Sequence, residues 1–151
     1  MRIDLSLTLP RDAATIAMAR HITTCALEEV GAATRTVDEV ALALSEACAN
    51  VVEHAGADDE YEVRLHLTDA VCEIEVVDSG GAIDLGDIDV DPGMPASPAG
   101  HGRGIALMRA LVDEINFVSQ PDRGTAVCLV KRLDLDPGAT RAAVKPIPRS
   151  A

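Results

Sequence analysis

The residue types best suited to chemistry lie along one edge of an expected helix: Glu46, Asn50, Glu53 and His54. Side chains four and seven positions apart stack on one side of a helix, so Glu46, Asn50 and Glu53 face the same way. An asparagine oxygen one turn from a carboxylate could ligate Mg²⁺ beside bound phosphates, while the carboxylate accepts a proton. The alternative interpretation of the same pattern is a solvated helix edge.

A second candidate is Asp78, which ends an expected strand in the stretch VVDSGGAIDL. Gly80 and Gly81 follow it almost at once. A carboxylate beside bare backbone could accept a hydrogen bond from an exocyclic amine, and the missing side chains would let a flat heterocycle such as adenine approach. A simple turn is the alternative.

Three glycines in AGHGRGIALM, namely Gly100, Gly102 and Gly104, come just before or at the start of a third helix. Glycines let backbone N–H groups close around phosphate oxygens, and a helix amino terminus adds positive potential. Arg103 could add a charge-assisted contact. A dinucleotide-binding domain needs its glycines in the first strand-to-helix turn of a parallel unit, whereas these open a late helix.

Other kinds of site are disfavoured. The four histidines, His21, His54, His66 and His101, show no metal-ligand spacing, and Ser45 and Ser79 do not sit in a nucleophile elbow. The 25 acidic against 13 basic side chains give a formal net charge of -12, which opposes direct nucleic-acid binding. No stretch approaches the roughly 20 apolar residues of a membrane span, and no signal core is evident, so we expect a cytoplasmic protein.

The core must be aliphatic, because the 151 residues include one Tyr and one Phe. We expect all four cysteines to be small buried hydrophobes, since none has C-x-x-C spacing. These are Cys25, Cys48, Cys72 and Cys128.

Hydrophobic periodicity predicts strands and helices in segregated runs. The expected order is a strand over 2–9 closed by Pro10, helices over 12–30 and 36–56, strands over 61–67 and 72–76, a helix over 103–114, and closing strands in FVS and TAVCLVKRL. Thr36 and Glu39 form the predicted capping box of the second helix.

These runs favour an α+β two-layer sandwich, with helices on one face of a mixed, mostly antiparallel sheet. Residues 78–102 show no periodicity and contain several glycines, which predicts a mobile lid. The domain is expected to span 1–133, and 134–151 to be a flexible tail.

Four ordered stretches resemble motifs of the GHKL superfamily of ATPases, whose ATP-binding domain has the Bergerat fold. ALSEACANVVEHA is similar to its Asn-containing box, VVDSGGAID to its Asp-Gly box, GHGRGIALMRALVDEI to its lid-glycine box and GTAVCLV to its closing strand. The resemblance covers about residues 1–133 and is strongest to the short branch of anti-sigma factor serine/threonine kinases.

The resemblance implies a role for each matching residue. Asn50 would coordinate Mg²⁺, and Glu46 would be the general base toward a serine hydroxyl. Asp78 would accept the adenine amine of ATP, Gly80 would give it room and Thr125 would complete the adenine site. Gly102, Arg103 and Gly104 would hold phosphates.

The implied function is a protein serine kinase that sequesters a sigma factor and phosphorylates an anti-anti-sigma protein of the STAS type. A homodimer is expected as well. Ala82 departs from the family pattern, which has glycine there. The alternative is therefore a binding module, weak or inactive in catalysis, that works by holding a sigma or anti-anti-sigma partner. A further alternative is a partner switch without a sigma factor.

Overall fold

The computed structural model describes residues 1–53, 60–78, 101–120 and 124–138. Most of the lid predicted over 78–102, namely residues 79–100, and Gly56 lie outside these residues. The elements in chain order are β1 (Arg2–Pro10), α1 (Ala13–Glu29), α2 (Thr34–Glu53), β2 (Glu60–Thr68), β3 (Val71–Asp78), α3 (His101–Leu111), β4 (Glu114–Gln120) and β5 (Gly124–Arg132).

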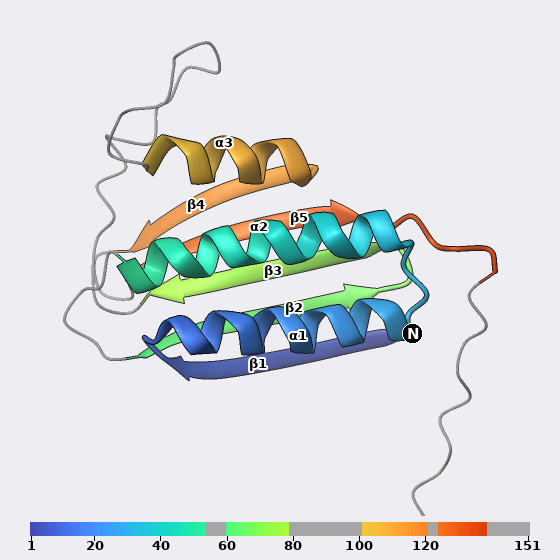
Figure 1. The fold of residues 1–151 in the computed structure, drawn as a ribbon, viewed down its shortest axis with the longest axis horizontal. Coiled ribbons are helices and arrows are strands. Elements are labelled where there is room, and N and C mark those ends of the chain that lie inside the picture. The colour runs from blue at the N-terminus through green and yellow to red at the C-terminus, as the bar shows by residue number, and fades with distance from the viewer. Residues whose placement is uncertain (54–59, 79–100, 121–123, 139–151) are drawn as a thin grey trace, which may run out of the picture.

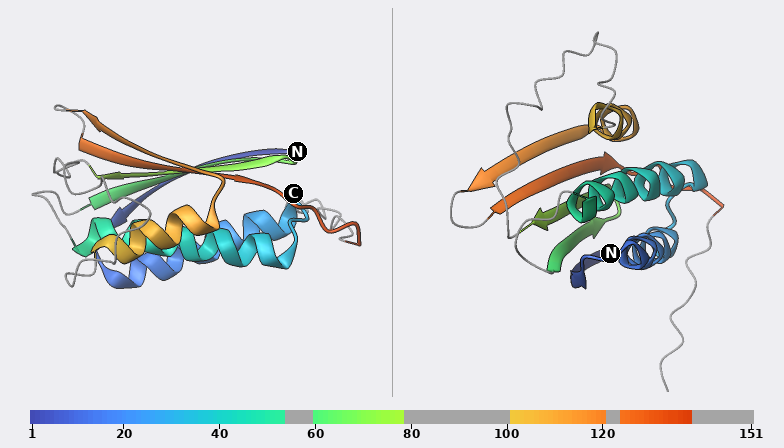
Figure 2. Two further views of the ribbon diagram at one scale, coloured as in Figure 1. Left: turned by 90° about the horizontal axis from the view of Figure 1, so that it is seen from above. Right: turned by 60° about the vertical axis from the view of Figure 1, so that its left-hand side comes forward.

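The described strands form one five-stranded sheet in the order β1-β2-β3-β5-β4. All four pairs of neighbouring strands are antiparallel. α1, α2 and α3 pack side by side on one face of this sheet, and the edge-on view in Figure 2 separates the two layers. The α+β two-layer fold is therefore confirmed, and so is the hairpin of β2 and β3 around Asp69.

The core lies between the sheet and α2. Alternation turns every second residue of β2 and β3 toward the helices, while the apolar stripe of α2 meets them. The fully or nearly fully buried members from these three elements are Val37, Val40, Ala43, Leu44, Ala47, Cys48, Val51, Tyr61, Val63, Leu65, Leu67, Cys72, Ile74 and Val76.

The start of α2 differs from the prediction. The helix begins at Thr34, Thr36 is buried inside it, and the N–H of Val37 donates to the Ala33 carbonyl at 3.0 Å. The Glu39 carboxylate instead accepts hydrogen bonds from Arg35 at 2.9 Å and from Lys131 Nζ at 2.7 Å. The predicted capping box was therefore wrong. The helix begins before Thr36, and the Glu39 carboxylate binds Arg35, one turn earlier in α2, and Lys131 of β5.

The end of the third helix also differs. α3 stops at Leu111, and Ile115 lies in β4 opposite Leu129 of β5. Ile115 fits the helical spacing of the preceding residues equally well, so only pairing with β5 decides its conformation.

Two of the predicted buried cysteines, Cys48 and Cys72, are buried, and burial raises the pKa of each thiol to about 12. They therefore stay protonated at neutral pH. Cys128 is half-buried, and Cys25 is exposed, so the prediction for Cys25 was wrong. Cys25 lies off the buried stripe of α1, which consists of Thr15, Ala19, Thr23 and Leu27.

The chain that follows β5 packs against the turn between α1 and α2. Ala33 N–H donates to the Asp134 carbonyl at 2.7 Å, Asp136 N–H donates to the Gly31 carbonyl at 2.9 Å, and Ala32 pairs with Leu135. Within the described part of the chain, no helix has the length and apolar character needed to cross a membrane.

We expect Leu44→Ala to lower the free energy of unfolding by about 2–5 kcal/mol, because the fully buried side chain leaves a cavity between α2 and the sheet. Leu42→Ala is the matched control on the same helix, since Leu42 is 43% exposed. Urea unfolding measures both changes. Equal losses in the two variants would contradict the assigned core.

The Lys131 and Arg35 hydrogen bonds lower the pKa of Glu39 below its ordinary value. This carboxylate therefore stabilises the fold above its unfolded pKa of about 4.3 and loses that contribution as the pH falls through the lower, folded value. We expect the stability lost in Glu39→Gln to be largest at pH 7 and to shrink at acid pH, as measured by urea unfolding. Glu28→Gln, at an exposed position of α1, serves as the control. A loss that does not vary with pH would refute the assignment.

Candidate active site

The predicted site residues that the structure describes lie toward one end of the sheet. β1, α2 and β3 end there, while α3 and β5 begin there (Figure 1). The antiparallel order of the strands causes this, because alternate chain ends return to the same edge of the layer. Motifs that are far apart in the sequence therefore share a small region.

Glu46 and Asn50 lie one turn apart on α2, both partly exposed, and face the amino-terminal turn of α3. A Cβ atom on Gly104 would lie 3.1 Å from Glu46 Oε2 and 3.5 Å from Asn50 Oδ1. The buried backbone of Gly104 thus lies directly against both side chains. The sequence predicted these three residues separately, and the fold brings them together.

Contacts along its length hold α3 in this position. At its carboxyl end the Leu111 carbonyl accepts a hydrogen bond from Lys131 Nζ at 2.8 Å, and Lys131 also pairs with Glu39. Met108, between the two ends, is fully buried in the core. Gly102 lies in the first turn of the helix, and Arg103 beside it is exposed.

Asp78 and Thr125 are opposite each other in the pairing of β3 with β5. Both are buried, with 3% and 1% of their surface exposed. Tyr61 of β2 flanks Asp78 on the other side. Two polar residues this deeply buried, side by side at a sheet end, form a built polar position rather than a solvent-facing turn.

Arg11 is a site residue that the sequence did not predict. This residue lies in the short link between β1 and α1, and its guanidinium pairs with Asp78 through Nη2 while Nη1 donates to the Val51 carbonyl at 2.7 Å. The pair is deeply buried, with side chains 6% and 5% exposed. One arginine after a strand-ending proline carries no periodic signal, so nothing in the pattern indicated it.

These contacts form one continuous path. It runs from Gly104 through Asn50 to the neighbouring Val51, and then through Arg11 to Asp78. The other candidates, Gly80, Gly81, Ala82, Gly100 and His54, lie outside the described residues.

Magnesium is the metal implied by the resemblance. The described residues hold no cluster of three or more His, Cys, Asp or Glu side chains that could cage a metal ion. Mg²⁺ in phosphoryl-transfer sites uses one or two protein oxygens, with waters and phosphates completing its shell. The hard amide oxygen of Asn50, beside Gly104, fits that requirement as the single protein ligand.

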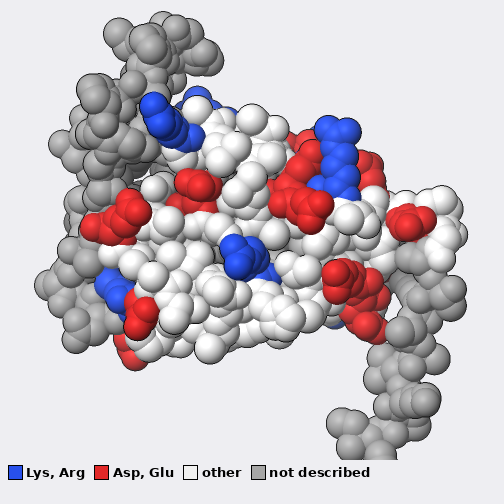
Figure 3. All heavy atoms as spheres, in the orientation of Figure 1, with Lys and Arg blue, Asp and Glu red and all other residues white. Residues whose placement is uncertain are grey.

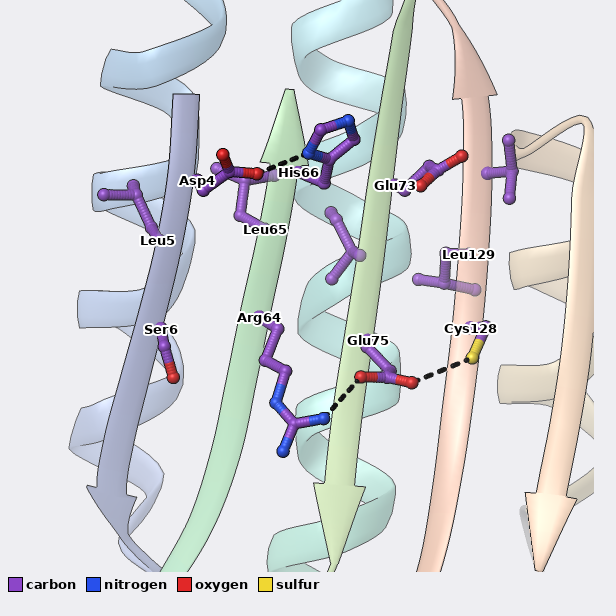
Figure 4. Close-up of a pocket in the computed structure, with 12 residues that line it drawn as sticks. Asp4, Leu5, Ser6, Arg64, Leu65, His66, Glu73, Glu75, Cys128 and Leu129 are labelled. Carbon is purple, nitrogen blue, oxygen red and sulfur yellow. Dashed lines mark hydrogen bonds and ion pairs between the residues drawn. The ribbon is translucent and has the colours of Figure 1, made fainter. Parts of the chain in front are cut away.

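An open hollow of ≈ 530 Å³ lies on the bare face of the sheet, away from the helices (Figure 4). Arg64 bridges to Glu75 at 2.9 Å there, and Glu75 lies 3.7 Å from the Cys128 sulfur. None of the predicted site residues lines this hollow. On the face shown in Figure 3, the described acidic and basic side chains are interspersed, so they form no continuous basic field of the kind that binds nucleic-acid backbones.

Comparison with known proteins shows the family to which the chain belongs. The family model of the histidine kinase-like ATPase domain matches residues 9–131. The chain is 34% identical over 118 residues to the serine-protein kinase RsbW of Bacillus licheniformis, covering 69% of this chain and 71% of that protein. It is 28% identical over 135 residues to the RsbW of Bacillus thuringiensis, covering 84% and 83%.

Among solved structures, the RsbU and RsbW domains of Rv1364c from Mycobacterium tuberculosis superpose with a TM-score of 0.65 at 25% identity. The match covers 87% of this chain and 32% of that longer protein. The fold and the sequence matches thus agree, and the chain belongs to the histidine kinase-like ATPase domain family, in the anti-sigma factor serine kinase branch of the GHKL superfamily.

Proposed function

We propose that this protein is a cytoplasmic, Mg·ATP-dependent serine kinase that also acts as an anti-sigma factor. It sequesters a sigma factor and phosphorylates a serine of a STAS-type anti-anti-sigma protein. The observation that carries the proposal is the direct packing of Gly104 on Glu46 and Asn50, in a chain whose relatives are named serine-protein kinases. Its homodimeric state stays a prediction.

In the proposed reaction, the substrate serine oxygen attacks the γ-phosphorus of ATP. The new bond joins that oxygen to the γ-phosphorus, and the bond from the γ-phosphorus to the bridging oxygen of ADP breaks. Glu46 takes the proton of the serine hydroxyl as general base. The products are phosphoserine and ADP.

The remaining residues bind and orient the nucleotide. Asp78 accepts a hydrogen bond from the adenine amine, next to Thr125, and Gly80 leaves room for the ring. The α3 amino terminus, with Gly102, Arg103 and Gly104, contacts the phosphates, because free N–H groups and positive potential collect there. Asn50 would hold Mg²⁺, which would neutralise phosphate charge.

A second function is favoured by Ala82, which stands where the family has glycine. It is a binding module that lacks catalysis and regulates by holding a sigma or anti-anti-sigma protein. Calorimetric titration separates the two proposals, because a kinase must bind Mg·ATP below millimolar concentration and the binding module need not. A partner switch without a sigma factor would show the same nucleotide binding but would not capture a purified sigma factor.

We expect Glu46→Ala to lower the rate of serine phosphorylation by about 10²- to 10⁴-fold while Mg·ATP binding changes little, because the base acts on the serine proton and not on the nucleotide. Phosphoserine formation on the partner protein measures the rate, and calorimetry measures the binding. Asp38→Asn, at an exposed position of the same helix, is the control and should keep the wild-type rate. A Glu46→Ala protein that phosphorylates at the wild-type rate would remove the proposed base.

Gly104→Ala tests the contact that carries the proposal. Alanine in place of glycine normally stabilises a helix by roughly 1 kcal/mol. Here the added methyl would lie 3.1 Å from Glu46 Oε2, so the carboxylate must shift by a few tenths of an ångström. We expect at least about a tenfold loss of phosphorylation rate in a folded protein.

Ala106→Ser, at an exposed position of α3, is the matched control. Circular dichroism checks that both variants are folded. Full activity in Gly104→Ala would show that the contact between α3 and Glu46 has no part in catalysis.

A further inference from the structure

Among the described ion pairs, Arg11 is the most deeply buried cation. The predicted chemistry gives it no role. A charged residue in a link between two elements is usually exposed, but only 6% of the Arg11 side chain reaches solvent. Burying a guanidinium costs free energy of desolvation that an ion pair offsets only with good geometry. Such a pair is weak evidence for stability, so its role has to come from its surroundings.

Two fixed acceptors hold the guanidinium. One is the Asp78 carboxylate at the end of β3. The other is the Val51 carbonyl at 2.7 Å, in the last turn of α2, where carbonyls lack helical partners and cations are favoured. Arg11 therefore joins the strand that carries Asp78 to the helix that carries Asn50.

The link that presents Arg11 is itself fixed. Asp12 caps α1 by accepting from Ala14 N–H at 2.9 Å. Thr15 Oγ1 lies 2.9 Å from the Tyr61 hydroxyl and also donates to the Pro10 and Asp12 carbonyls. Tyr61 in turn flanks Asp78 in the sheet. The arginine is thus positioned by both the backbone and the sheet.

One feature of this residue does not serve stability. Arg11 Nε is buried and has no hydrogen-bond partner among the residues that the structure describes. Buried donors are nearly always satisfied, and exceptions collect at functional sites. An arginine retained for packing alone would carry no such cost.

The charge on Arg11 determines what Asp78 can recognise. An ionised carboxylate only accepts hydrogen bonds, whereas a protonated carboxyl also donates one. The Arg11 guanidinium holds the Asp78 carboxylate in one orientation, and a carboxylate that loses this partner can turn away from the position in which it meets the purine. Adenine presents a donor amine at its 6-position, and guanine or hypoxanthine presents an acceptor oxygen there.

We propose that Arg11 is a positioning and specificity residue: it keeps Asp78 a fixed, purely accepting carboxylate, and the nucleotide site therefore selects 6-amino purines over 6-oxo purines. This inference rests on the proposed ATP-binding function and deepens it. Arg11 acts through Asp78, so the role differs from that of a group that contacts the reacting atoms.

Binding of Mg·ATP and Mg·ITP to the full chain tests the inference, because the two nucleotides differ at the purine 6-position. We expect wild type to prefer ATP by at least about tenfold, since a site built around a hydrogen bond rejects the wrong partner. In Arg11→Gln the ratio should fall toward one. Arg35→Gln, which removes an exposed arginine of α2, should keep the wild-type ratio.

Arg11→Lys keeps the charge and should restore the preference for ATP to within about threefold of wild type, even if both nucleotides bind more weakly. If Arg11→Gln fails to fold, as judged by circular dichroism, Arg11→Met replaces it: this variant keeps the length of the side chain without its charge, and its ratio should also fall toward one. If Arg11 had a purely structural role, removing its charge would weaken the binding of ATP and of ITP alike and would leave the ratio of the two affinities unchanged.

The outcomes distinguish a failure of the proposed role of Arg11 from a failure of the proposed ATP-binding function. A wild-type protein that prefers ATP, with an unchanged ratio in Arg11→Gln, overturns the role of Arg11 alone. Tighter ATP binding in Arg11→Gln at the same ratio would show that Arg11 blocks the site, and it overturns the inference as well. A wild-type protein that binds neither nucleotide overturns the proposed function, and the role of Arg11 with it.

Discussion

The packing of α2 on the sheet is the constraint on which the rest of the structure depends. Its buried stripe, with Val40, Leu44 and Cys48, fixes the rotation of the helix about its axis. That rotation leaves Glu46 and Asn50 on the edge that meets α3. Because a helix turns as a rigid body, the apolar stripe sets the direction of the polar edge. One face of α2 therefore packs in the core, and its neighbouring edge carries the candidate site.

The two ends of the sheet, with the helices packed on it, carry different kinds of contact. At one end, the chain gathers polar groups that are buried or half-buried: Asp78, Thr125, Arg11 and the Glu46 edge. At the other end, Lys131 ties α3 to β5 and α2 through the Leu111 carbonyl and Glu39. The second end fixes the position of α3, and the first end holds the buried polar groups of the proposed site. A small domain can keep one unsatisfied buried group, here Arg11 Nε, when the remaining contacts are well satisfied.

The sequence by itself determined the order and type of the elements, the apolar stripe of α2 and the neighbourhood of Glu46 and Asn50. These are local properties, since helical and strand periodicity and i to i+4 spacing need no knowledge of distant residues. The aliphatic core followed from composition, and the segregated runs of helices and strands predicted the two-layer α+β fold that the structure shows.

The tertiary structure alone decided what depends on distant partners. Thr36 is no cap because α2 already begins at Thr34, and Lys131, far along the chain, pairs with Glu39. Ile115 lies in a strand because it pairs with Leu129 of β5. The contact of Gly104 with α2, the pairing of Asp78 with Thr125 and the burial of Arg11 arise between segments that no local pattern relates. Side chains become neighbours across such distances only when the whole core closes, and periodicity carries no information about that closure.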